Sequence, residues 1–172
     1  MRRVVTGPGD NGNAAILLDG EPPMSVHFGQ YHTTELWVTD SSPPAVLGAE
    51  VAGLADPSAR PWELEPPPGG SCFRIVRIAP ESGDTQAAAA DSGTRTDAAE
   101  AGQGDDPGFL AEHATATLDY LVVISGEVTL TVAGSEVTLG PGDAVVQQGV
   151  AHDWRNRGTE PCVLAGVLIS TR

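Results

Sequence analysis

The second half of the chain alternates short apolar segments with glycine-containing turns, and this alternation restricts the fold more than any other feature. Turn residues recur between segments rich in Val, Ile, Leu and Thr. The expected strands are 112–117, 120–125, 128–132, 136–139, 144–146 and 163–169. Short strands at even spacing predict an all-β fold, either a closed antiparallel barrel or a two-sheet jelly roll.

The composition fits one domain and argues against two classes of partner. A chain of 172 residues can bury a core, and its 21 glycines and 14 prolines favour turns over long helices. The formal net charge of −14 disfavours a nucleic-acid partner, because phosphate binding needs a basic surface. No segment approaches the ~20 apolar residues that cross a bilayer, so no membrane partner is expected.

The cysteines and the first residues predict a cytoplasmic protein. The segment 1–7 lacks the apolar run of a secretory signal. Cys72 and Cys162 each lie in or beside an expected strand. We therefore expect two reduced thiols that are buried as small apolar side chains.

The chain is expected to divide into an N-terminal arm, residues 1–70, and a barrel, residues 71–172. The arm has expected strands at 3–6, 14–18 and 34–39, with Glu35 in solvent, and a proline-rich segment that wraps the barrel or a partner subunit. The barrel begins with an expected strand at 71–78. An acidic insertion at about 82–108 contains no large apolar side chain, so we expect it to be disordered.

The segment 140–156 carries the most specific motif of the chain. A Gly-Asp pair stands at 142–143, Gly149 turns the chain, His152 follows three residues later, and Asn156 comes four residues after it. The order along the chain is a turn, a short strand, a second turn and then a residue that can ligate a metal or titrate. This order places one titratable side chain at the mouth of a β-barrel. This order resembles the second motif of the cupin family.

Two details of this segment depart from the common form of the motif. Gln147 occupies the position of the usual proline, and the span from Gly142 to Gly149 is one residue shorter than usual. The offsets from Gly149 to His152 and Asn156 are kept.

The strand before Gly126 matches the first cupin motif in part. His113 stands at the first histidine, Thr115 at the second histidine and Asp119 at the glutamate. Because alternate residues of a strand share one face, His113, Thr115, Thr117 and Asp119 are expected to point together into the barrel. The two motifs imply a single cupin-type double-stranded β-helix, a jelly-roll barrel, with an N-terminal β arm.

The resemblance implies a divalent metal, but the donor set differs from that of the family. Members of the family bind the ion through three histidines and one glutamate. Here His113, Asp119 and His152 remain, which is the two-histidine, one-carboxylate formula of non-haem iron sites. One hypothesis is therefore a catalytic Fe, Mn, Ni or Zn ion held by these three residues.

Two other interpretations of the same cluster stay open. A histidine paired with a carboxylate is a tunable general base, so the site can work without a metal, as in cupins that resemble carbohydrate epimerases. The cluster can also be purely structural, with both histidines bonded to Asp119, threonines or water. Thr115, Thr117 and Trp154 are the other expected pocket residues, and packing within the sheet is the alternative role of Trp154.

Two functions remain in view. The first is a small-molecule enzyme that uses His113, Asp119 and His152, as an isomerase, cyclase, dehydratase or oxygenase; the likeness to small single-domain cupins implies a secondary metabolite as substrate. The second is a non-catalytic barrel that binds a small apolar ligand. An inward cluster of His, Asp and Thr favours the enzyme. We also expect a homodimer in which the N-terminal strands add to the sheet of a second subunit.

Overall fold

The computed structural model describes residues 1–9, 12–44, 56–81 and 112–172, and these form strands but no helix. None of the described segments could therefore cross a membrane as a helix. The strands are β1 (Arg3–Pro8), β2 (Ala14–Gly20), β3 (Met24–Phe28), β4 (Tyr31–Thr39), β5 (Ser71–Ile78), β6 (Thr117–Ser125), β7 (Val128–Val132), β8 (Ser135–Leu139), β9 (Ala144–Gln148), β10 (Asp153–Arg155) and β11 (Cys162–Ser170). The all-β prediction is confirmed.

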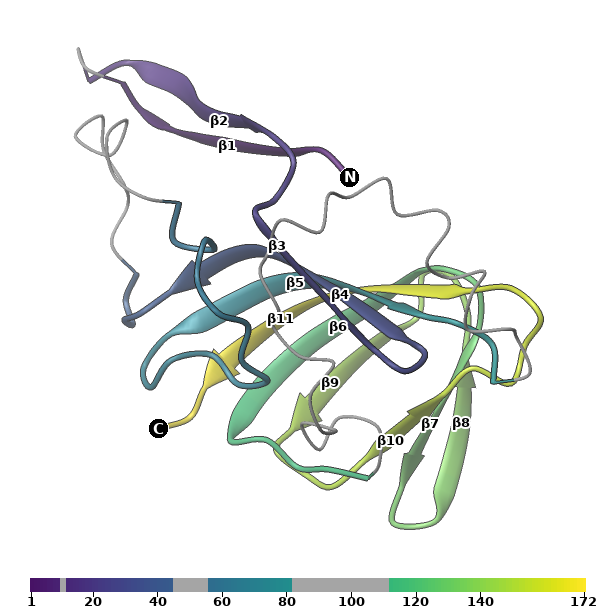
Figure 1. Ribbon diagram of the computed structural model, residues 1–172. Helices are drawn as coiled ribbons and strands as arrows, with labels where there is room; N and C mark the ends of the chain where they lie inside the picture. The colour runs from purple at the N-terminus through teal and green to yellow at the C-terminus, as the bar shows by residue number, and fades with distance from the viewer. Residues whose placement is uncertain (10–11, 45–55, 82–111) are drawn as a thin grey trace.

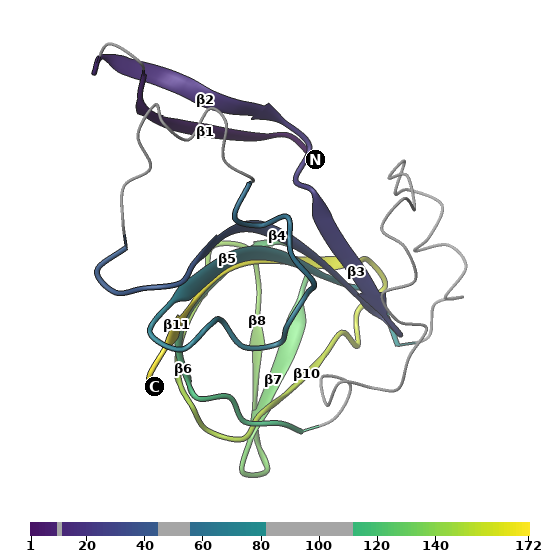
Figure 2. The same cartoon turned by 60° about the vertical axis from the view of Figure 1, so that its left-hand side comes forward.

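Two antiparallel sheets face each other and enclose the interior of the barrel (Figure 1). The larger sheet has the order β3-β4-β5-β11-β6-β9, and the smaller has the order β10-β7-β8. The hairpin β1–β2 forms a sheet of its own and stands away from the barrel (Figure 2).

The predicted boundary at residue 70 does not separate the arm from the barrel. β3 pairs with β4, and β4 pairs with β5, so residues 24–39 extend the larger sheet of the barrel. β4 buries Tyr31, the run 33–36 and Val38, and its register with β5 shifts at a bulge between Glu35 and Trp37. Within the described ranges the arm is therefore limited to β1 and β2. The insertion expected at 82–108 lies outside the described residues.

The strand predicted at 112–117 does not form. Within 112–116 only His113 pairs, in an isolated antiparallel bridge with His152. β6 begins at Thr117 and continues to Ser125 as one strand. The physical reason is that His113 pairs with the chain next to the smaller sheet, whereas β6 pairs with β11 and β9 of the larger one. The backbone must cross between the sheets before β6 starts.

Strict alternation decides which side chains enter the barrel. On β5, Cys72, Arg74, Val76 and Ile78 are buried, while Phe73 is exposed. Cys72 and Cys162 are both buried free thiols, as predicted. Gly126, which ends β6, has φ 73°, and a Cβ there would lie 2.4 Å from the Pro161 carbonyl oxygen. The closing glycine of the first motif is thus required by both conformation and space.

One half of the interior is an apolar cluster. Burial of each aliphatic side chain in it contributes about 1.5–3 kcal/mol. The apolar cluster consists of Tyr31, Val76, Ile78, Val123, Val128, Leu130, Leu139, Trp154, Cys162 and Leu164. Asn156, fully buried beside it, donates to the carbonyls of Ile78 and Glu160 and accepts from the Gly158 N–H. The motif asparagine therefore holds a turn.

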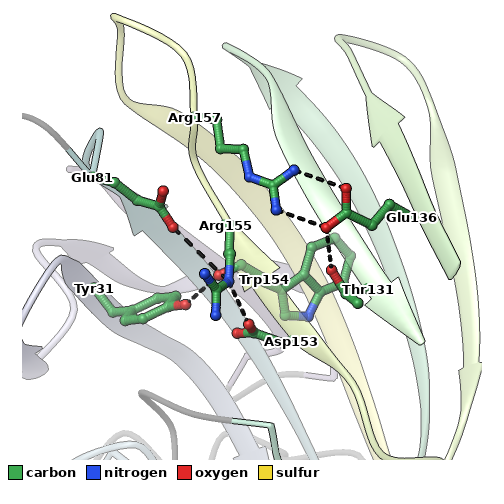
Figure 3. A network of polar contacts seen from close by, with 8 residues as sticks. All are labelled: Tyr31, Glu81, Thr131, Glu136, Asp153, Trp154, Arg155 and Arg157. Carbon is green, nitrogen blue, oxygen red and sulfur yellow. Dashed lines mark hydrogen bonds and ion pairs between the residues drawn. The ribbon is translucent and has the colours of Figure 1, made fainter. Parts of the chain in front are cut away.

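Polar contacts close this half from outside (Figure 3). The Tyr31 hydroxyl donates to the Trp154 carbonyl at 2.6 Å. Arg155 pairs with Asp153, and Arg157 forms two contacts with Glu136 on β8. Since these arginines are about half exposed, the pairs add little stability; the Arg157–Glu136 pair links the segment after β10 to β8.

Candidate functional site

The other half of the barrel interior is lined by polar side chains, and we call it the polar half. Arg74 on β5 and Thr117 and Asp119 on β6 are inward and polar, whereas the inward residues nearer the ends of these strands belong to the apolar cluster. The polar half consists of Glu35, Arg74, His113, Thr115, Thr117, Asp119, Gln147 and His152. It contains all three residues of the predicted catalytic cluster.

His113 and His152 lie side by side. Their backbones exchange two hydrogen bonds, with N···O distances of 3.0 and 2.9 Å. Their ring centroids are 4.5 Å apart, and the rings are tilted by 56°. His152 is 4% exposed and His113 is half-buried. Burial lowers the pKa of His152, and the neighbouring His113 lowers it further, so the neutral imidazole is favoured.

Gln147 contacts His152 and lies opposite Asp119 in the β6–β9 pairing. Its side-chain nitrogen contacts both ring nitrogens of His152 and lies 2.7 Å from Nε2. The Nδ1 atom of His152 lies 2.8 Å from the Val150 carbonyl, to which it donates, and these partners assign Nε2 as the acceptor from Gln147. Gln147 on β9 is directly opposite Asp119 on β6. The order in space is therefore His113, His152, Gln147, Asp119.

Sequence reasoning did not select Gln147, although a signal was present. Gln147 occupies the position of the usual cupin proline, and it shares the inward face of β9 with Val145. A polar side chain at an inward position of a barrel needs a partner.

Asp119 is a buried carboxylate with unused hydrogen-bonding capacity. It is 5% exposed, and its Oδ1 atom has no hydrogen-bond partner within the described structure. Burial raises the pKa of Asp119, and this effect outweighs the neighbouring Thr117, Arg74 and His113, which lower it. On β11, Leu168 lies opposite Asp119 and packs with Val38 and Cys72. The carboxylate therefore borders apolar surface.

Glu35 is inside the barrel, so its expected exposure to solvent is wrong. It is 4% exposed and its Oε1 lies 2.7 Å from Nε of Arg74, which stands directly opposite on β5. The reason is the register of β4, which turns Glu35 inward next to the cation that balances its charge. Burial raises the pKa of Glu35, while Arg74 opposes the shift.

Arg74 is held on every side. Its Nη1 donates to the Leu64 carbonyl at 3.0 Å, and Nη2 donates to the Glu63 carbonyl and to Sγ of Cys72. Trp62 covers the guanidinium, with its ring centroid 5.4 Å from Cζ. A cavity of about 340 Å³ lies against Glu35, Arg74 and Trp62. The polar half thus has an adjoining space bounded by the proline-rich segment.

The three remaining predicted pocket residues have different surroundings. Thr115 and Thr117 are buried, and their hydroxyl oxygens are 2.7 Å apart. Trp154 belongs to the apolar cluster and meets His152 edge-on, with the ring centroids 6.3 Å apart.

The side chains as placed do not fit a metal ion. Among the described residues, no three His, Cys, Asp or Glu side chains converge on one point. His152 uses Nδ1 on the Val150 carbonyl and Nε2 on Gln147, so neither nitrogen is directed at Asp119. No chemical step is therefore derived through a metal.

An antiparallel jelly roll with two histidines and a carboxylate in its polar half defines the class of protein. A family model described as the cupin domain matches residues 100–169. Residues 100–169 therefore match the cupin domain, and the all-β barrel has the cupin fold.

The curated relatives come from fungal biosynthesis clusters. Phomopsin biosynthesis cluster proteins C′ and D of Diaporthe leptostromiformis are each 33% identical over 91 residues, which cover 52% of this chain and 34% of the relative. Oryzines biosynthesis cluster protein J of Aspergillus oryzae is 51% identical over 45 residues, 26% of this chain and 25% of the relative. The chain thus spans about a third or less of the length of these relatives.

Similar solved structures include two bacterial proteins. A cupin 2 conserved barrel domain protein from Salinispora arenicola has 13% identity and a TM-score of 0.46, covering 86% of this chain and 82% of that one. The plu4264 protein of Photorhabdus luminescens has 12% identity and the same TM-score and coverage.

Proposed function

We propose that the polar half of the barrel is the active site of a small-molecule enzyme that works by acid–base catalysis without a metal. The observation that supports it best is the buried Asp119 carboxylate, whose Oδ1 has no partner in the described chain, while Gln147 stands opposite it and His113 is close enough to lower its pKa. A buried group with free capacity next to a histidine pair is the arrangement that general acid–base catalysis needs.

Asp119 is the group that exchanges a proton with the substrate. Oδ1 takes a proton from a C–H or O–H group of the bound molecule and returns it at a second position of the same molecule. Gln147 holds the imidazole of His152 in one tautomer, and His113 is the second titratable group beside the site. A proton shift within one molecule consumes no oxidant, so isomerisation, cyclisation or loss of water suits this site.

The relatives support a substrate from secondary metabolism. Their names place them in clusters for phomopsin and oryzine biosynthesis. By analogy we propose that the substrate of this chain is a secondary metabolite small enough to enter a cupin barrel.

The proposal is tested by deuterium incorporation. Full-length protein is incubated in D2O with a metabolite extract of its host, and mass spectrometry detects metabolites that gain deuterium. The expected result is incorporation by the wild type and a loss of rate of about 100-fold or more in Asp119→Asn, since a positioned acid or base contributes about that factor. Glu136→Gln, a similar change on the exposed surface of β8, should keep the full rate.

Three results would contradict this function. Unchanged turnover by Asp119→Asn would remove Asp119 from the chemistry. Elemental analysis that finds near-stoichiometric Fe, Mn, Ni or Zn in the wild type, lost in both His113→Ala and His152→Ala, would replace the metal-free proposal with the metal hypothesis. A bound ligand recovered chemically unchanged, without any incorporation, would favour the non-catalytic barrel.

A further inference from the structure

Hydrogen-bond donors and acceptors in the polar half are not balanced. Asp119 Oδ1 and Gln147 Oε1 are both buried acceptors without a partner in the described structure. The two residues are 5% and 4% exposed and face each other across the β6–β9 register. An unpaired buried acceptor is unfavourable, so two adjacent ones mark a place where donors are missing.

The recorded contacts of the nearby donors are made to other groups. Arg74 forms an ion pair with Glu35 and donates to the Leu64 and Glu63 carbonyls and to Sγ of Cys72. His152 donates to the Val150 carbonyl and accepts from Gln147. The hydroxyl groups of Thr115 and Thr117 bond to each other. None of these recorded contacts reaches Asp119 Oδ1 or Gln147 Oε1, so the two atoms are available to donors of a bound molecule.

We infer that the ligand of the polar half is a non-anionic small molecule that presents two neighbouring N–H or O–H donors to Asp119 Oδ1 and Gln147 Oε1. This inference rests on the proposed function and specifies its substrate class. Vicinal diols and ammonium groups have this chemistry. A carboxylate or phosphate offers only acceptor oxygens, which would face two further acceptors and leave all of them unpaired.

The position of the acceptors also orients the ligand. Leu168 lies opposite Asp119 on β11, and Leu121 is the next inward residue on β6. A Cβ on Gly166 would lie 2.5 Å from Cδ2 of Leu121, so the glycine leaves room for the Leu121 side chain over β11. A ligand that donates to Asp119 and Gln147 would therefore place its carbon skeleton against Leu121 and Leu168.

The test compares probes that share one carbon ring. cis-1,2-Cyclohexanediol, cyclohexylammonium and cyclohexanecarboxylate are titrated into full-length protein, and the side-chain amide signals of Gln147 and the ring signals of His152 are followed by NMR. The diol and the ammonium are expected to shift these signals with at least tenfold tighter binding than the carboxylate. Gln147→Met and Asp119→Asn should each weaken the ammonium at least tenfold, and Glu136→Gln should leave it unchanged.

The outcomes separate this inference from the proposed function. Binding of the carboxylate as tightly as the diol, at the same signals, would overturn the donor requirement and leave the acid–base site in place. Equal binding of the ammonium by wild type and by both folded variants would also overturn it. If none of the probes shifts Gln147 or His152, the polar half does not bind small molecules and both proposals fail.

Discussion

The Asp119 side chain is both buried and ionisable, and burial disfavours its charged form. Burial raises its pKa. A carboxyl with a raised folded-state pKa favours folding below its unfolded pKa of about 3.9, and this contribution is lost as the pH rises through the folded value. At neutral pH the ionised side chain therefore destabilises the folded state.

Asp119→Asn is accordingly expected to stabilise the protein at pH 7. Removing a buried unpaired charge should raise the free energy of unfolding by on the order of 1 kcal/mol, and the difference should vanish at low pH, where the aspartate is protonated in both states. Urea unfolding at neutral and acidic pH measures this.

Glu136→Gln is the matched control, with the opposite sign. Arg157 lowers the pKa of Glu136, so its charged form stabilises the fold and the variant should be slightly less stable at pH 7. An Asp119→Asn variant that is less stable than wild type at both pH values would contradict the account given for Asp119.

A site residue can be predicted from the sequence where the alternation of faces along a strand determines whether its side chain points inward. His113, Asp119 and His152 were placed in one interior because alternate residues share a face and two motifs fix the strands. The roles of Gln147, Glu35 and Arg74 were not predicted, because their partners depend on the register in which neighbouring strands pair. The contact of Glu35 with Arg74 joins β4 to β5, and Gln147 meets Asp119 through the β9–β6 pairing. One sequence, read alone, does not give register between strands.

At the scale of the element, β5 and β7 begin and end where predicted, because turn residues bound them and their interiors are apolar or β-branched. β3 and β10 were missed. β10 has three residues, too few for a periodic pattern, and β3 follows a proline pair with mixed polarity. The first cupin motif starts outside a strand, at an isolated bridge, which alternation alone cannot distinguish from strand pairing.

The β3–β4 hairpin contains a pH-dependent element. His27 and His32 are directly opposite each other, and their rings stack with centroids 4.0 Å apart and an interplanar angle of 10°. Burial, with the nearby His27 and Arg77, lowers the pKa of His32 to about 4. A depressed pKa supports stability above the unfolded value of about 6.5, and this stability is lost as the pH falls toward the folded value.

His32→Phe is expected to reduce this pH dependence while keeping the stacking. Between pH 7 and about pH 4.5 the wild type should lose on the order of 1 kcal/mol more than the variant, a value already discounted for solvent screening of the half-exposed ring. Thermal unfolding across this range gives the measurement. Parallel pH profiles for the two proteins would show that His32 does not carry the effect.

At the scale of the whole molecule, the outer face of the larger sheet is apolar and exposed. Tyr120, Val122 and Ile124 on β6 are 48%, 39% and 53% exposed, and Val146 on β9 is 60% exposed. Sheet faces of this kind are normally covered, by helices or by another chain.

The N-terminal arm supplies the complementary surface. Val4 on β1 and Ile16 on β2 are 48% and 64% exposed. Between the arm and the same face of the sheet lies a cavity of about 700 Å³ with an apolar lining that includes Trp37 and Phe73. The arm of one chain thus covers the β4–β5 side of its own sheet and leaves the β6–β9 side open.

We propose that a second copy of the chain covers this β6–β9 surface, in a two-fold dimer in which each arm contacts the sheet of the other. A two-fold interface uses the same patch on both subunits, so a single change acts twice.

Val122→Asp combined with Ile124→Asp should convert the dimer into a monomer, because four carboxylates would be buried between apolar faces. Light scattering coupled to gel filtration should give twice the 17.7 kDa chain mass for the wild type and the single mass for the variant. Val137→Asp, at a side chain 49% exposed on β8 of the smaller sheet, should remain dimeric. A wild-type chain that runs as a monomer at micromolar concentration, or a Val137→Asp variant that dissociates as readily, would show that the second copy does not bind at this face.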